Sequence, residues 1–393
     1  MSDKSDIPLS LEENDRSGKP VRFAIAIPVL GQVEFVSAAL RSLEMQSVEM
    51  EIAILDATPG EAIQGVVANY ANLPLAYIRH GSDGGQAAAI QEGWEHTQGE
   101  ILGWLNADDY LIPESLKTVE EVFAMKGEID VVYGDAIFVD RGGTFRSYFP
   151  AISSDISNIV ASCCIAQPAC FVRRSAVERI GGISTDLTYI MDWDLWTRLF
   201  ISGARFFYVK QPLAVVRMYE ETKTASGSWR RLYEIQSHLR RYHRFARLVV
   251  VTIALIADAA RKGSPYWQKA LRSGVESCRR LKAKWGGRLG EMKGRELYGI
   301  DIGGDRVRSI AEVWLPWLKE EEPSQIVING EFARLTIEVN GTEFEDMTLR
   351  RGPDGNMETT CSIPRDCRKS NLFVMKLRDH SEQPWTLSSV QIV

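Results

Sequence analysis

The chain lacks several features that would assign it to a class at once. Its six cysteines form no C-x-x-C pair and no zinc-type spacing, so reduced thiols without a structural metal are expected. Its longest apolar run, residues 248–257, covers only about half of a bilayer-spanning helix. The polar first twenty residues contain no apolar core of a signal peptide, and we find no internal repeat or low-complexity tract. These absences argue against a zinc module, a membrane-spanning protein and a repeat protein.

Charge is unevenly distributed along the 393 residues, although the formal net charge is only −6. Between Arg230 and Arg288 the sequence has fifteen Lys and Arg residues and three acidic residues, so the net charge of this segment is about +12. The rest of the chain therefore has a net charge of about −18. With 45% hydrophobic and 25% charged residues, the composition is that of a globular protein. The length predicts more than one domain, and the acidic remainder argues against a nucleic-acid partner.

Apolar segments of strand length alternate with helical patterns in the first third of the chain. This alternation predicts an α/β fold with a doubly wound, mostly parallel sheet, in which ligands bind outside the carboxyl ends of the strands. The expected strands are Phe23–Leu30, Glu51–Asp56, Leu75–His80, Ile101–Leu105 and Val131–Val139, and the expected helices are Val33–Gln46, Gln86–His96 and Pro113–Met125.

The pattern changes twice further along the chain. From about residue 229 it becomes helical and basic, and beyond residue 297 short alternating segments are divided by Asn-Gly, Gly-Pro-Asp-Gly and Pro. We therefore expect a flexible tail over 1–20, an α/β domain over 21–228, a basic helical connector over 229–296 and an all-β sandwich or jelly-roll domain over 297–393.

The run GEILGWLNADDYLIP, residues 99–113, carries the clearest chemical signal. A buried strand delivers Asp108 and Asp109 side by side to a sheet edge, which adds little stability. Carboxylate oxygens are the ligands that Mg²⁺ and Mn²⁺ prefer, so the pair is a candidate metal site. The alternative is a solvated turn in which one of the two acids caps the next helix.

Five segments in order resemble the family 2 glycosyltransferases of the GT-A fold, and the bacterial enzymes of surface polysaccharide synthesis in particular. The resemblance covers residues 21 to 225 and is carried by AIAIPVLGQVEFVSAALRSLEMQ, EIAILDATPG, DGGQAAAIQEGWEHTQGEILGWLNADD, CCIAQPACFVRRSAVERIGGI and MDWDLWTRL. It implies a nucleotide-sugar donor and a divalent cation, Mn²⁺ or Mg²⁺.

The resemblance also implies roles for particular residues. Pro28 would line the nucleotide site, and Asp56 would contact the base or ribose. Asp83 and Gln86 match the D-G-G-Q motif near the nucleotide and the donor sugar. The remaining roles are metal ligand for Asp109, a neighbouring position toward ribose or metal for Asp108, and general base for Asp192. From the sequence alone, Asp56 could equally be a strand-end cap, and Asp192 or Asp194 a helix cap.

One departure from the family pattern concerns the metal. Where the family commonly has R-x-H, this chain reads VVRMYEETKT, with Tyr219 in the place of the histidine. We therefore expect Arg217 and Lys223 to stabilise the pyrophosphate and the cation to depend on Asp109, phosphate and water. The loop Ala57–Gly60 also departs from the family, which leaves the preferred base open.

The expected function is inverting transfer of a sugar to a saccharide or polyprenyl-lipid-linked acceptor in surface polysaccharide synthesis. The alternatives are a non-catalytic carbohydrate- or nucleotide-binding protein on a degraded scaffold and, less well supported, a nucleotidyltransferase. The basic stretch is either a solvated helical face or a membrane-surface contact, which would place a cytoplasmic protein on the inner face of the membrane. The C-terminal β module is expected to have either a structural role or an acceptor-positioning role, without chemistry of its own.

Overall fold

The computed structural model describes residues 22–149, 156–220, 222, 229–242 and most of 296–393. In the last stretch, the description omits 299, 302–305, 308–309, 320, 334, 345–346, 352–355, 364–366 and 381–384. The predicted tail, Lys223 and most of the basic connector lie outside the described residues. No helix in the described ranges is long and apolar enough to cross a membrane.

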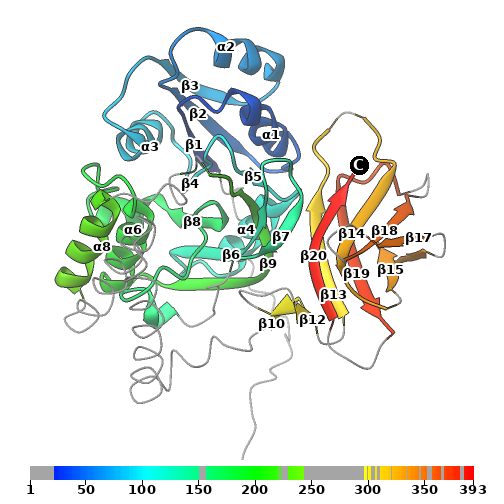
Figure 1. The fold of residues 1–393 in the computed structure, drawn as a ribbon. Coiled ribbons are helices and arrows are strands. Elements are labelled where there is room, and N and C mark those ends of the chain that lie inside the picture. Colours follow the sequence, from blue (N-terminus) through cyan, green and yellow to red (C-terminus); the bar gives the residue numbers. More distant parts are fainter. Residues whose placement is uncertain are drawn as a thin grey trace, which may run out of the picture.

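The N-terminal α/β region is built on a mixed sheet with helices on both faces (Figure 1). Its core order is β3-β2-β1-β4-β8-β6, and β9 pairs with β6 and with the short β5. The strands are β1 Phe23–Val29, β2 Met50–Asp56, β3 Leu75–His80, β4 Ile101–Trp104, β5 Tyr110–Leu111, β6 Val131–Val139, β7 Phe145–Tyr148, β8 Cys170–Arg173 and β9 Phe206–Arg217. The helices are α1 Val33–Glu44, α2 Ala62–Val67, α3 Gln86–Glu95, α4 Ser115–Met125, α5 Arg174–Arg179, α6 Met191–Ile201 and α8 Trp229–Tyr242.

These elements follow from the apolar pattern of the sequence. Strand β1 is buried over nearly its whole length, as expected of a central parallel strand with both faces covered. Helix α1 buries an apolar face at helical spacing. Gly93 lets α3 approach the sheet, since a Cβ there would lie 2.8 Å from Leu55 and 2.9 Å from Ala26. The predicted strands and helices are confirmed to within two residues at their ends.

Parallel pairing brings several strand ends to one edge of the sheet. Val29 pairs with Asp56, and Asp56 pairs with His80, in parallel register. Strand β8 is antiparallel to both β4 and β6, so β6 runs in the same direction as β4. Strand β9 is parallel to β6, with Arg217 opposite Val139. The ends of β1, β2, β3, β4, β6 and β9 therefore share one edge, where the candidate residues lie.

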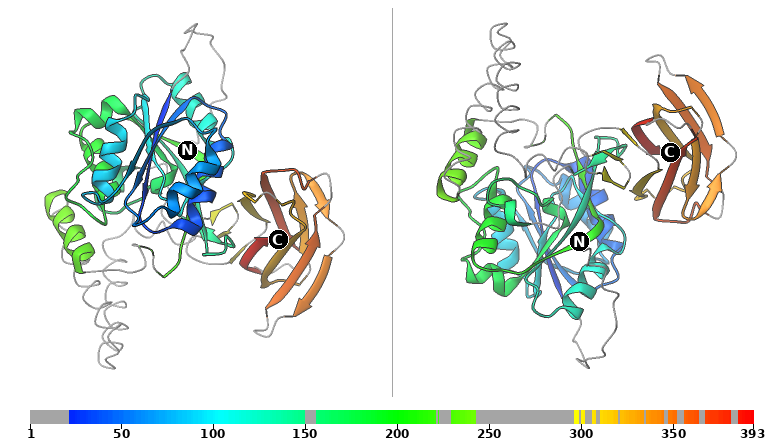
Figure 2. Two further views of the ribbon diagram at one scale, coloured as in Figure 1. Left: turned by 90° about the horizontal axis from the view of Figure 1, so that it is seen from above. Right: turned by 90° about the horizontal axis from the view of Figure 1, so that it is seen from below.

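The C-terminal β region forms two antiparallel layers beside the α/β region (Figures 1 and 2). One layer contains β13-β19-β15-β16, and the other contains β14, β17, β18 and β20 and ends in β12-β11-β10. Alternate residues of β13 and β15 are buried, which is typical of a sandwich strand. The strands are β10 Glu296–Leu297, β11 Ile300–Asp301, β12 Arg306–Val307, β13 Ile310–Pro316, β14 Gln325–Glu331, β15 Leu335–Val339, β16 Thr342–Phe344, β17 Met347–Arg351, β18 Met357–Ser362, β19 Leu372–Asp379 and β20 Trp385–Ile392.

The two regions share a sheet and a hydrophobic core. Val390 of β20 pairs with Phe145 of β7, which joins both regions in one continuous hydrogen-bonded sheet. The cluster that fills the sandwich also includes Ile137, Val139 and Phe145 of the α/β region. The C-terminal β region is therefore packed onto the α/β region rather than only tethered to it.

A cleft of about 380 Å³ lies between α1 and the C-terminal β region. Ser37 and Arg41 of α1 line one side, and Trp317 and Lys319 line the other. Arg217, at the end of β9, also contributes to its wall. The cleft therefore borders the sheet edge that gathers the candidate residues.

Candidate active site

The acid pair lies in the turn directly after β4. The Asp109 side chain is only 4% exposed. Its Oδ1 accepts a hydrogen bond from the Arg217 backbone N–H at 3.1 Å, and its Oδ2 accepts one from Asn106 Nδ2 at 2.9 Å. Asp108 is half-buried, and its Oδ2 accepts a hydrogen bond from the Tyr219 hydroxyl at 2.8 Å. The two predicted metal ligands thus lie side by side. Arg217 and Asn106 hold Asp109, and Tyr219 holds Asp108.

Burial changes the proton affinity of this pair. Desolvation, followed by the nearby charge of Asp108, raises the pKa of Asp109 to about 8. Burial and the hydrogen bond to Asp108 also raise the pKa of Tyr219, so its hydroxyl stays protonated and donates to Asp108. Without a cation, Asp109 is therefore neutral near pH 7, and a bound cation would have to displace its proton.

Arg217 brings a positive charge beside the acid pair. Its Nε donates to the Asp108 carbonyl at 3.2 Å, and its Nη1 donates to the Arg141 carbonyl at 2.7 Å. The guanidinium lies 4.6 Å from the centre of the Phe35 ring. Two of its nitrogens are thus occupied by backbone carbonyls, so the structure gives Arg217 a role in shaping the turn as well as supplying charge.

A chain of amide side chains connects the acid pair to α3. Gln86 Nε2 donates to Asn106 Oδ1 at 2.7 Å, and Asn106 Nδ2 lies 3.0 Å from Gln167 Oε1 as well as near Asp109. Gln167 Nε2 donates in turn to the Trp104 carbonyl at 2.7 Å. The sequence predicted Gln86 near the donor and left Gln167 open between an acceptor or phosphate role and an ordinary turn residue, but it assigned no role to Asn106. The position of Asn106 directly before the acid pair was the available signal.

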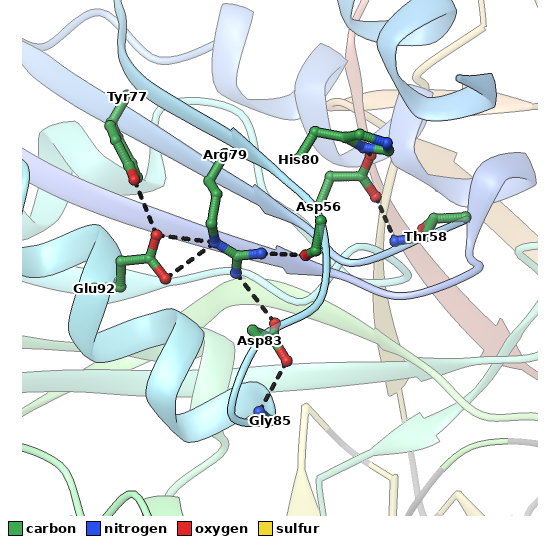
Figure 3. A network of polar contacts seen from close by, with 9 residues as sticks. Asp56, Thr58, Tyr77, Arg79, His80, Asp83, Gly85 and Glu92 are labelled. Atoms are coloured by element: carbon green, nitrogen blue, oxygen red, sulfur yellow. Dashed lines mark hydrogen bonds and ion pairs between the residues drawn. The ribbon is translucent and has the colours of Figure 1, made fainter. Parts of the chain in front are cut away.

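Asp56, at the end of β2, is covered by a histidine from the next strand. The Asp56 side chain is 2% exposed, and its Oδ1 accepts a hydrogen bond from the Thr58 backbone N–H at 2.8 Å. His80 Nδ1 lies 2.7 Å from Asp56 Oδ2, and the histidine side chain is 35% exposed (Figure 3). Sequence reasoning singled out Asp56 but not His80, which only the β2–β3 register places beside it.

Asp83 is held in place by a second network at the same edge. Its Oδ2 accepts from Arg79 Nη2 at 3.2 Å, and its Oδ1 accepts from the Gly85 backbone N–H at 2.8 Å (Figure 3). Glu92 of α3 accepts two hydrogen bonds from Arg79 Nε, at 2.9 and 3.0 Å, and one from the Tyr77 hydroxyl at 3.0 Å. Because Gly85 has a φ of 103°, the loop turns sharply into α3.

Asp192 and Asp194 have different surroundings in the first turn of α6. Asp192 is half-buried, its Oδ1 accepts a hydrogen bond from the Trp193 backbone N–H at 2.7 Å, and desolvation raises its pKa. Asp194 is 3% exposed and accepts from Ser184 Oγ at 2.6 Å and Arg198 Nε at 2.7 Å. Burial opposes ionisation of Asp194, but the nearby His238 ring and the hydrogen bonds from Ser184 and Arg198 lower its pKa to about 2.

The predicted residues thus fall into two connected groups at the sheet edge and one further position, Asp192, on a separate helix. Asp56 and Asp83 lie at the ends of β2 and β3, and Gln86 connects that side to Asp108 and Asp109 through Asn106. Pro28 is half-buried near the end of β1. Asp192 stands apart on α6. In the described ranges, no three His, Cys, Asp or Glu side chains gather as a ready metal cage.

The chain is similar in sequence to known proteins. The family model described as Glycosyl transferase family 2 matches residues 24–181. An uncharacterized glycosyltransferase of Haemophilus influenzae is 24% identical over 227 residues, which cover 56% of this chain and 76% of that protein.

Two solved structures are also similar to this chain. TarS of S. aureus in complex with UDP-GlcNAc is 14% identical, covers 64% of this chain and 79% of its own, and has a TM-score of 0.47. The mannosyltransferase PcManGT of Pyrobaculum calidifontis, in complex with GDP-Man and Mn²⁺, is 17% identical, covers 70% and 86%, and has a TM-score of 0.46.

The family match spans β1 to α5, and therefore includes the strand ends and the acid pair described above. The chain is therefore similar to family 2 glycosyltransferases over this segment, and a C-terminal all-β region follows it.

Proposed function

We propose that the protein transfers a sugar from a nucleotide-sugar donor to a saccharide or lipid-linked acceptor with inversion, in the synthesis of a surface polysaccharide. The separation of two acid sites carries the proposal. Buried Asp109 and half-buried Asp108 lie at the sheet edge, and Asp192 lies on a separate element, α6. An inverting displacement needs one acid site for the leaving group and another for the acceptor hydroxyl.

The residues at the acid pair fit a divalent cation, Mn²⁺ or Mg²⁺. Asp109 and Asp108 supply carboxylate oxygens, and the small number of protein ligands suits a cation that shares its remaining positions with phosphate and water. Such a cation offsets the charge that grows on the diphosphate as its bond to the sugar breaks. Tyr219 holds one oxygen of Asp108, and Arg217 adds a fixed positive charge beside the pair.

The donor nucleotide would occupy the edge formed by the ends of β1, β2 and β3. Asp56 is too buried for extensive direct contact, so it orients His80 and the Thr58 backbone toward the base or ribose. Asp83 and Gln86, each fixed by its own hydrogen bonds, would lie toward the ribose and donor sugar.

Asp192 is the proposed general base. The acceptor hydroxyl oxygen attacks the anomeric carbon while the bond from that carbon to the diphosphate oxygen breaks, and Asp192 takes the hydroxyl proton. Its raised pKa, caused by burial, suits a group that must accept a proton near neutral pH. Asp194, held by Arg198 and with a pKa of about 2, is a poor proton acceptor.

The cleft beside α1 is the proposed location for a remote part of the acceptor. Its lining combines hydroxyl and cationic groups, from Ser37, Arg41 and Lys319, with apolar and aromatic side chains. Sugar rings offer both hydroxyl groups and an apolar face, so such a lining suits them. The exposed face of α8 carries Arg230, Arg240 and Arg241, which is compatible with a lipid-linked acceptor at an anionic membrane surface.

Release of nucleotide tests the proposal. Purified protein is mixed with UDP-, GDP- and dTDP-sugars, Mn²⁺ and a panel of saccharide acceptors, and free nucleotide is measured. The Asp109→Ala, Asp192→Ala double variant is the control. If the unmodified protein released no more nucleotide than the double variant from any donor and acceptor, the proposal would be wrong.

A second candidate is a non-catalytic binding protein on the same scaffold. The observation in its favour is Tyr219, whose hydroxyl occupies an oxygen of Asp108 where the family commonly has a histidine. Nucleotide binding measured by calorimetry, without turnover of any donor, would favour this candidate.

A further inference from the structure

Helix α8 touches the turn that leads into α6 through a buried carboxylate. Glu234 is only 5% exposed. Its Oε1 accepts from the Thr188 backbone N–H at 3.1 Å, and its Oε2 accepts from those of Tyr189 at 2.8 Å and Ile190 at 3.3 Å. Ile190 is the N-cap residue of α6 and supplies no side-chain cap of its own. Glu234 therefore caps α6 from a separate helix.

A second buried residue of α8 continues the contact one turn later. The His238 ring packs on Trp193, with centroids 4.4 Å apart. Its Nε2 lies 3.3 Å from Thr197 Oγ1, and its Nδ1 lies 3.8 Å from Asp194 Oδ1. Glu234 thus contacts the turn that precedes Asp192, and His238 contacts the residues of α6 that follow it. We call these two residues the α8 clasp (compare α6 and α8 in Figure 1).

Attaching α8 to α6 through the buried carboxylate of Glu234 costs more free energy than attaching it through apolar contacts alone. Removing a carboxylate from water costs several kcal/mol unless its oxygens are fully paired, whereas apolar contacts attach a helix at lower cost. Here the carboxylate accepts from three consecutive backbone N–H groups that end two residues before Asp192, and Arg230 of the same helix donates to its Oε1 at 3.2 Å. The main effect of burying this carboxylate is therefore to fix the position of one short turn.

We propose that Glu234 and His238 are positioning residues that fix the carboxylate of Asp192 toward the acceptor hydroxyl, so that α8 completes the catalytic centre. This inference rests on the proposed role of Asp192 as base. A displacement of about 1 Å at a reacting group can lower a rate about a hundredfold, so loosening the clasp should act on kcat rather than on donor binding.

The surroundings of Asp192 give the pH dependence that follows. The groups whose charge acts on the pKa of Asp192 are Arg231 and His238, both on α8, and Asp192 in turn acts on the thiols of Cys163 and Cys170. Desolvation dominates and raises the pKa of Asp192. A loosened clasp admits water, so this pKa should fall and the acid limb of the kcat profile should move to lower pH.

The test uses the full chain with Glu234→Gln and, because that variant could destabilise the fold, also His238→Gln. Exposed Ser237→Ala on the same helix is the control. Four quantities are measured: turnover of UDP-GlcNAc or GDP-mannose, the pH profile of kcat, binding of UDP or GDP by calorimetry, and amide hydrogen exchange across residues 188–193 without ligand. We expect kcat to fall about 10- to 100-fold with nucleotide affinity within about twofold, and exchange at 188–193 to quicken. Ser237→Ala should change none of these.

Two outcomes would overturn the inference, and they differ from failure of the proposed function. Unchanged hydrogen exchange at 188–193 in both folded clasp variants would show that the clasp does not hold the turn. Faster exchange with an unchanged kcat and acid limb would show that the turn does not position the base. If the unmodified protein turns over no donor at all, the proposed function fails, while the exchange measurement still tests the clasp by itself.

Discussion

Raising the pH from 6 to 8 should strengthen Mn²⁺ binding by about fiftyfold, because Asp109 must lose a proton before it can hold a cation. Burial and the neighbouring charge of Asp108 raise the pKa of Asp109 to about 8. Below that pH each bound cation releases one proton, so the dissociation constant should fall about tenfold per pH unit, or about 1.4 kcal/mol.

The assay is a titration of free Mn²⁺ by electron paramagnetic resonance at several pH values between 6 and 8, with and without UDP or GDP. Asp109→Asn should abolish both the binding and its pH dependence. Asp186→Asn, which removes the same charge from an exposed position, should leave both unchanged. A dissociation constant that stays flat between pH 6 and 8 would refute the reasoning, since it would mean that Asp109 is already ionised or is not a ligand.

The same group predicts the sign of a stability change in the metal-free protein. Between about pH 4 and 8, Asp109 is protonated in the folded state and ionised in the unfolded state. The unfolded state therefore binds fewer protons, and this contribution to stability falls as the pH rises through that range. Asp109→Asn should remove the decline, so its melting temperature relative to the unmodified protein should rise with pH.

Four further substitutions separate the other roles. Asp192→Asn should lower kcat by about two to four orders of magnitude with nucleotide affinity unchanged, and a larger loss in Asp194→Asn would reverse the assignment. Asp194→Asn should instead lower stability by about 2 kcal/mol at pH 7, and in the unmodified protein this contribution should disappear as the pH falls from about 4 to 2. Asp56→Asn should weaken UDP or GDP binding about tenfold by calorimetry without changing kcat at saturating donor. Tyr298→Phe removes a hydrogen bond of 2.5 Å to buried Asp135. The free energy of unfolding should therefore fall by about 1–3 kcal/mol, and the melting temperature should fall with it, while turnover persists.

The interface between the two regions also determines how the C-terminal β region should be tested. Tyr148 donates to the Glu312 carbonyl at 2.8 Å, and Phe145 pairs with Val390. Truncation after residue 295 would expose this shared core, so loss of activity in a truncated chain would not isolate an acceptor role. Substitution of Lys319 in the cleft preserves the core and is the better probe.

Local patterns were sufficient to predict the elements that position most of the site. Continuous apolar runs predicted β1, β2 and β4, and parallel pairing then required Asp56 and the acid pair to share an edge. Alternation predicted the C-terminal sandwich. The roles assigned to the site residues remain predictions until the substitutions above are measured.

Other features depend on contacts between segments far apart in the chain. The insertion of antiparallel β8 between β4 and β6 follows from pairing energies that no local pattern contains. His80 reads as an ordinary strand residue until the register sets it beside Asp56. Glu234 likewise reads as one acid in a basic stretch, and only the packing of α8 on α6 shows what it binds.

The pairing of β7 with β20 has a consequence for how the protein is made. On the ribosome, Phe145 emerges long before Val390, by ~10–50 s at bacterial elongation rates of roughly 5–20 residues per second. Throughout that interval the edge of β7 and the apolar side chains around it have no partner, and such exposed edges attract other chains. Nascent chains of this protein should therefore recruit a chaperone after the α/β region has emerged, and should release it only once the last strand is made.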